Sequence, residues 1–106
     1  MIPPQLESFM DQLIRWTEQS KIKWREGASD NAYICSHNDY TLHVNYWFDP
    51  DAERGIYTMR IVKEARDAHF TVTDNEADAL TMRNFIASVS VNAAGFDDIV
   101  DDFFSE

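Results

Sequence analysis

The chain has 106 residues, of which 44% are hydrophobic and 13% aromatic. This length suits one domain, spanning residues 1–106, and the composition is that of a folded protein rather than a disordered one. The 19 acidic residues outnumber the 9 basic ones and give a net charge of −10. Such a field repels phosphate backbones, so we expect no nucleic acid partner and favour basic proteins as partners.

The cysteine count and the N-terminal segment bear on the compartment. Cys35 is the only cysteine, so no intrachain disulfide can form and a reducing compartment is expected. The segment Met1–Ser8 has neither a basic region nor a long apolar run, so no secretory signal and no membrane span are predicted there. We therefore expect a cytoplasmic protein with no membrane association.

The N-terminal quarter predicts a helix followed by a short extended piece. Pro4 suits a first helical position, and apolar residues then recur at spacings of three and four up to about Ser20. Ile22 and Trp24 alternate with basic residues, which indicates an extended segment with its large side chains inward. Gly27 ends this segment.

The stretch Tyr40–Phe48 is the predicted central strand. Apolar and aromatic residues occupy its even positions and Thr41, His43 and Asn45 lie between them, as expected for a strand with one face on a core. Residues 31–37 form the predicted strand before it, joined by a tight turn at Asn38-Asp39. A two-residue turn pairs residues 37 with 40, 35 with 42 and 33 with 44.

The remaining elements follow in order. Residues 56–62 predict a third strand and residues 69–73 a fourth, separated by a charged stretch. Thr73 and Glu76 match a capping box, and the helix after them carries an apolar stripe until Gly95. Residues 96–106 alternate apolar and acidic positions, which predicts a short acidic helix.

These elements predict an α+β fold: an N-terminal helix, a three- to four-stranded antiparallel sheet, a C-terminal helix and a short acidic terminal helix, with the helices on one sheet face. The expected core contains residues from every main element: Leu13, Leu42, Val44, Ile61 and Ile86.

Catalytic and metal-binding patterns are weak. Cys35, His37, Asp39 and His43 are close in sequence, but the register puts His43 on the face opposite to Cys35 and His37. Ser36 and His37 point to opposite faces and cannot form a dyad. Three isolated glycines cannot build a phosphate-binding loop. We predict no catalytic residues, no metal site and no cofactor.

The second face of the sheet is the first candidate site. Residues of the polar parity lie there, among them Trp47, which is more apolar than a solvated face requires. The candidate protein interface comprises Ile34, His43, Trp47, Arg60 and Val62. The alternative is that the terminal acidic helix folds back and covers this face.

The acidic C-terminus is the second candidate site. Residues 71–106 hold one basic and eight acidic residues, a net charge of −7. Its candidate acidic surface comprises Asp97, Asp98, Asp101 and Asp102. The apolar stripe of this segment can pack on its own domain, or the helix can enter a basic partner's groove. Mimicry of a nucleic-acid backbone is a third interpretation.

The spacing Phe9-x-x-x-Leu13-Ile14-x-x-Thr17, followed by Ile22-x-Trp24, resembles the start of small stand-alone bacterial domains of helix–sheet–helix build, many of them uncharacterised. The resemblance covers about the first quarter of the chain and is a packing pattern. It implies a bacterial or phage-related origin and identifies no catalytic residues.

Three hypotheses follow. The first is a small acidic, non-enzymatic protein-binding domain that forms a homodimer through its sheet. The second is an immunity or antitoxin-type protein that neutralises a basic toxin or nuclease. The third is an enzyme of unrecognised chemistry.

Overall fold

The computed structural model describes residues 1–105, without the side chains of residues 96–98 and 100. The fold is α+β, as predicted, but the sheet has five strands. The elements are η1 (Pro4–Leu6), α1 (Glu7–Glu18), β1 (Trp24–Glu26), β2 (Ala32–His37), β3 (Tyr40–Asp49), β4 (Arg54–Lys63), β5 (Arg66–Thr73), α2 (Ala79–Ala94) and α3 (Phe96–Phe104).

The five strands form an antiparallel meander in the order β1-β2-β3-β4-β5. The predicted register of β2 on β3 is confirmed, because Tyr33 pairs with Val44 and Cys35 with Leu42. The turn between them accounts for this register. Asn38 and Asp39 have φ values of 49° and 67°, as a two-residue hairpin turn with both central residues left-handed requires.

Two strand boundaries differ from the sequence-based expectation. The extended piece at Trp24 is a true edge strand, since Trp24 pairs with Cys35. The charged stretch after Val62 does not break the sheet, because Lys63 pairs with Arg66 across a two-residue turn. Glu64 takes a positive φ of 53° in that turn, a role that glycine or asparagine more often signals.

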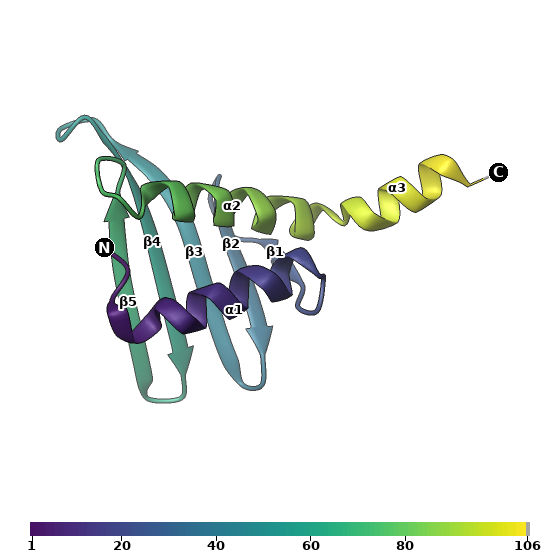
Figure 1. Ribbon diagram of the computed structural model, residues 1–106, viewed down its shortest axis with the longest axis horizontal. Helices are drawn as coiled ribbons and strands as arrows, with labels where there is room; N and C mark the ends of the chain where they lie inside the picture. Colours follow the sequence, from purple (N-terminus) through teal and green to yellow (C-terminus); the bar gives the residue numbers. More distant parts are fainter. Residues whose placement is uncertain (106) are drawn as a thin grey trace.

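Helices α1 and α2 lie side by side across the same face of the sheet (Figure 1). The core lies between them and the inward side chains of the strands. Leu13, Leu42 and Val44 are buried there as predicted, whereas Ile61 and Ile86 are only partly buried at its border. The largest fully buried side chains are those of Trp24, Phe85, Met10, Met59 and Met82.

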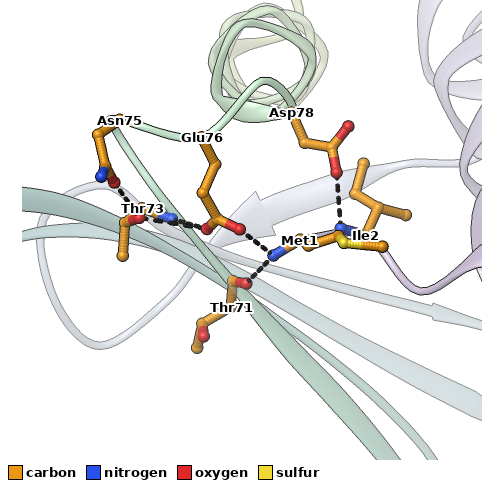
Figure 2. A network of polar contacts seen from close by, with 7 residues as sticks. All are labelled: Met1, Ile2, Thr71, Thr73, Asn75, Glu76 and Asp78. Atoms are coloured by element: carbon orange, nitrogen blue, oxygen red, sulfur yellow. Dashed lines mark hydrogen bonds and ion pairs between the residues drawn. The ribbon is translucent and has the colours of Figure 1, made fainter.

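The chain between β5 and α2 contains one of the two hydrogen bonds of the predicted capping box. The Glu76 carboxylate accepts a hydrogen bond from the Thr73 backbone N–H at 2.6 Å. It also lies 2.7 Å from the Met1 ammonium, which donates to the Thr71 carbonyl oxygen (Figure 2). The Ile2 N–H donates to Asp78 at 2.8 Å. This network fixes the N-terminal segment on β5, and α2 begins only at Ala79.

Helix α3 continues from the end of α2 and points away from the sheet (Figure 1). Gly95 makes the junction with a φ of 69°, a left-handed conformation that ends α2. The longest dimension of the molecule is accordingly 50 Å. Within the described residues α3 contacts α2 only near their junction and does not lie over either face of the sheet (Figure 1). The alternative in which the terminal helix folds back over the second sheet face is therefore not the one found in residues 1–105.

Candidate protein-binding surfaces

The face of the sheet opposite to α1 and α2 is called the outer face here. Its side chains follow from the strand register, in cross-strand rows. One row contains Arg25, Ile34, His43, Arg60 and His69. The neighbouring rows contain Ser36, Thr41, Val62 and Asp67 on one side, and Ala32, Asn45, Thr58 and Thr71 on the other. Two further rows contain Trp47, Ile56 and Thr73, and then Asp49 and Arg54.

The outer face carries apolar side chains in contact with solvent. Trp47 is 46% exposed, and its cross-strand partner Ile56 is half-buried. Ile34 and Val62 are half-buried in the other rows. Ile56 is the one branched aliphatic residue directly beside Trp47, because Ile34 and Val62 lie two and three rows away along the strands. An exposed tryptophan with an aliphatic neighbour on an uncovered face is typical of an interface.

The charge of the outer face differs from that of the rest of the chain. Arg25, Arg54 and Arg60 lie on it, against Asp49, Asp67 and Asp74, which is 3.9 Å from the Arg54 guanidinium. With its histidines neutral the face has no net charge, so the rest of the chain carries the whole net charge of −10. This is a nearly neutral face on a strongly acidic protein.

Arg60 and Asp67 form the strongest polar contact on the outer face. The Arg60 guanidinium donates from both Nε and Nη2, with Nη2 2.6 Å from Asp67 Oδ2. This hydrogen bonding lowers the pKa of the Asp67 carboxyl, and the nearby His69 and His43 act in the same direction. The pair is exposed, so we attribute little stability to it. It does fix the direction of the Arg60 side chain.

A hollow of about 390 Å³ opens beside Ile34, His43 and Arg60. Small residues of the connection between β1 and β2 leave this space: Gly27, Ala28, Ser29 and Ala32. The outer face thus has a depression next to its central row rather than a flat surface.

The candidate interface residues from the sequence all lie on the outer face, namely Ile34, His43, Trp47, Arg60 and Val62. The candidate interface predicted from the sequence omitted Ile56 and Arg25, although the alternation along their strands places both on this face. Of the candidate acidic residues, Asp101 and Asp102 are exposed on α3. The side chains of Asp97 and Asp98 lie outside the described residues.

A second hollow lies on the helical side of the sheet and is called the α1 groove here. It has a volume of about 250 Å³, between α1 and the turn that joins β2 to β3. Its apolar lining consists of Phe9, Leu13, Trp16, Ile22, Tyr40 and Leu42. Gln12, His37 and Asn38 complete it. Within the described part of the chain, no carboxylate lines this groove.

The residues of catalytic type remain dispersed. Burial raises the pKa of the Cys35 thiol, which makes it a poor nucleophile. Among residues 1–105 with described side chains, no three His, Cys, Asp or Glu converge in a way that could hold a metal ion. None of the helices in this part of the chain is both long and apolar enough to span a bilayer.

Comparison of the chain with protein-family models, with curated proteins and with solved structures returned no match. The outer face and the α1 groove are therefore the features of this chain that bear on its function.

Proposed function

We propose that this protein is a small acidic protein-binding domain, without catalytic activity of its own, that self-associates through the outer face of its sheet. The observation that carries the proposal is the exposure of Trp47. Both long helices pack on the opposite face, and α3 points away from the molecule (Figure 1). Trp47 and its neighbour Ile56 therefore have no cover within residues 1–105.

The charge distribution favours a second copy of the same chain as the occupant. Two copies with a net charge of −10 each repel over most of their surfaces. The repulsion is smallest where two outer faces without net charge meet. A two-fold arrangement also brings Trp47 of each copy to the same patch of the other, as isologous contacts require.

The size of the outer face suits a stable contact. Strands β3 and β4 have ten residues each, so each is about 33 Å long. Five strands spaced about 4.8 Å apart, three of them shorter, give a flat area on the order of 600 Å². Side chains corrugate such a face, which brings its accessible area close to the roughly 800 Å² that each partner contributes to a standard interface.

The test is the substitution Trp47→Glu, measured by light scattering and by thermal melting. The expected result is a particle of half the wild-type mass with an almost unchanged melting temperature. The mass falls because the interface would bury an unpaired carboxylate. The fold survives because the core lies on the other side of the sheet.

Leu80→Glu is the matched control. Leu80 is another exposed apolar residue, on α2, so the substitution adds the same charge away from the outer face. Its particle mass should equal that of the wild type. A Trp47→Glu protein with unchanged mass would show that the outer face is not the self-association surface.

A second candidate function, neutralisation of a basic toxin or nuclease, is favoured by the projecting α3. Asp101 and Asp102 are exposed there beside exposed phenylalanines, which suits a basic partner with an apolar groove. This function predicts a toxin gene next to the gene of this protein. This protein would associate with that toxin several-fold more slowly at high salt than at low salt, because rim charges act mainly on the association rate.

The double variant Asp101→Asn/Asp102→Asn tests this second function. It should slow association with the toxin, whereas Asp30→Asn/Asp51→Asn, which removes two exposed charges in loops, should have a smaller effect. Equal changes in the association rate for the two double variants would mean that the net charge of the protein, and not Asp101 and Asp102 in particular, affects this rate.

A further inference from the structure

Helix α3 exposes large apolar side chains to solvent. Phe103 and Phe104 are 77% and 75% exposed, and Ile99 is 52% exposed. Ile99 and Phe103 are four residues apart and share one side of the helix. The two phenylalanine rings pack edge to face, with 4.8 Å between their centroids, so they present one joint apolar surface. Asp101 and Asp102 lie beside them and are exposed.

The α1 groove has the complementary character. Its lining is mostly aromatic and aliphatic, and two ammonium groups lie at its border. The Lys21 ammonium lies 5.6 Å from the centroid of the Trp16 ring, and the Lys63 ammonium 4.8 Å from that of the Tyr40 ring. An apolar hollow bordered by lysines is suited to a helix that combines phenylalanine with aspartate.

We propose that the α1 groove binds α3 of a second copy of this chain. Phe103 and Phe104 enter the groove, and Asp101 and Asp102 face the Lys21 and Lys63 ammonium groups. The proposal concerns a surface distinct from the outer face and does not depend on the function proposed above.

The dimensions agree with this occupant. A cavity of about 150 Å³ lined by apolar side chains holds benzene. The α1 groove, with about 250 Å³, therefore has room for at least one phenyl ring. Burial of a phenylalanine removes about 150–250 Å² from water, which makes such a ring an effective anchor. Both partners of this contact are otherwise left with exposed apolar surface.

The positions of α3 and of the α1 groove in the molecule favour a contact in which each copy inserts its α3 into the groove of the other. Helix α3 leaves the molecule at the side of β1 (Figure 1), and the groove opens at the turn between β2, which is next to β1, and β3. A two-fold axis at this side brings each α3 to the groove of the other copy, which closes the contact. The outer face remains available, so a copy can make both contacts, and these close into an assembly of four chains if the two two-fold axes are perpendicular and intersect.

The first test is the double variant Phe103→Ser/Phe104→Ser, measured by light scattering over a range of concentrations. We expect half the wild-type particle mass and a protein that stays folded, because these side chains lie outside the core. The melting temperature should fall only by the stabilisation that the contact between copies supplied. Leu80→Ser/Val91→Ser is the matched control, since both residues are exposed apolar residues of α2. The control should keep the wild-type mass.

The second test uses a groove variant in a mixing experiment. Tyr40→Glu places a carboxylate at the groove border, next to Lys63, and should also halve the particle mass. Gln12→Glu is a milder substitution of an exposed groove residue, for use if Tyr40→Glu does not fold. The phenylalanine variant keeps an intact groove and the groove variant an intact α3. Their mixture should therefore contain heterodimers joined by one α3 in one groove, in addition to any contact through the outer face.

The outcomes separate this proposal from the previous one. Trp47→Glu should reduce the mass independently, and combining it with Phe103→Ser/Phe104→Ser should give particles of the 12.3 kDa chain mass. Retention of the wild-type mass by Phe103→Ser/Phe104→Ser overturns the α3 exchange and leaves the outer-face contact intact. Shielding of Phe103 and Phe104 from solvent to the same extent at every protein concentration would also overturn it, since α3 would then occupy the groove of its own chain.

Discussion

Asn92 in α2 accepts a hydrogen bond from the backbone N–H of Trp24 in β1, with 2.7 Å between Oδ1 and N. Its amide nitrogen donates to the carbonyl oxygens of Thr17, at 3.1 Å, and Ile22, at 2.9 Å. One buried side chain therefore joins the end of α1, the connection after it and the edge strand to α2. These hydrogen bonds of Asn92, and not the length of β1, explain why a three-residue strand is held in place.

Asn92→Ala should lower the free energy of unfolding by about 3 kcal/mol. The substitution leaves the Trp24 N–H and the Ile22 carbonyl without this partner, whereas the Thr17 carbonyl still accepts a hydrogen bond from the Ser20 N–H. Each unsatisfied group costs roughly 1–3 kcal/mol when water cannot replace the partner. Denaturant unfolding measures the change. Asn84→Ala, at an exposed position of the same helix, is the control and should change stability little. Equal unfolding midpoints for the two variants would contradict the proposed role of Asn92.

Truncation of the central strand tests the core. Leu42→Ala or Val44→Ala should each cost about 2–4 kcal/mol, because both side chains are buried between the sheet and the helices. Ser36→Ala on the outer face should have little effect. Losses below about 0.5 kcal/mol at both core positions would contradict the placement of this strand at the centre of the core.

The sheet was predictable where local chemistry determined it. Asn38 and Asp39 both favour the left-handed region, and their two-residue turn set the register of β2 on β3, which in turn assigned Ile34 and Trp47 to the outer face. The turn at Glu64 carried no such signal, so the continuation of the sheet from β4 to Arg66 was missed. Strand β1 was too short for its alternation to indicate strand pairing.

Contacts between distant segments were not predictable from local patterns. The spacing of Ile99 and Phe103 shows which side of α3 is apolar, but it does not show what that side packs against. The capping-box residues Thr73 and Glu76 suggested an earlier helix start than Ala79. Their side chains instead serve a network with Met1, which is distant in sequence (Figure 2). The α1 groove also required residues from four separate segments.

The Cys35 thiol should react slowly in the native protein. It is buried on the inner face of β2, and burial raises its pKa, so little thiolate is present and reagents cannot reach it. A disulfide reagent should react at least about a hundredfold more slowly with the folded protein than with the urea-unfolded protein, since reaction requires opening of the structure. Equal rates would mean that this side of β2 is accessible.

Glu76 should make stability depend on acid pH. The hydrogen bond from the Met1 ammonium, and then that from the Thr73 N–H, lowers the pKa of the Glu76 carboxyl below its ordinary value. A depressed carboxyl pKa stabilises the fold above the unfolded-state pKa, near 4.3, and this contribution is lost as the pH falls through the folded-state pKa. Glu76→Gln should therefore melt at a lower temperature than the wild type near pH 6.

The difference between the two proteins should shrink as the pH falls through the lowered folded-state pKa of Glu76, and disappear where the wild-type carboxyl is protonated. It should also shrink in high salt, because the Met1–Glu76 ion pair is partly exposed to solvent. Glu18→Gln, at an exposed position of α1, is the control for loss of a single charge. A melting difference for Glu76→Gln that persists unchanged at the lowest pH would assign the effect to the shape of the side chain, and not to the ion pair.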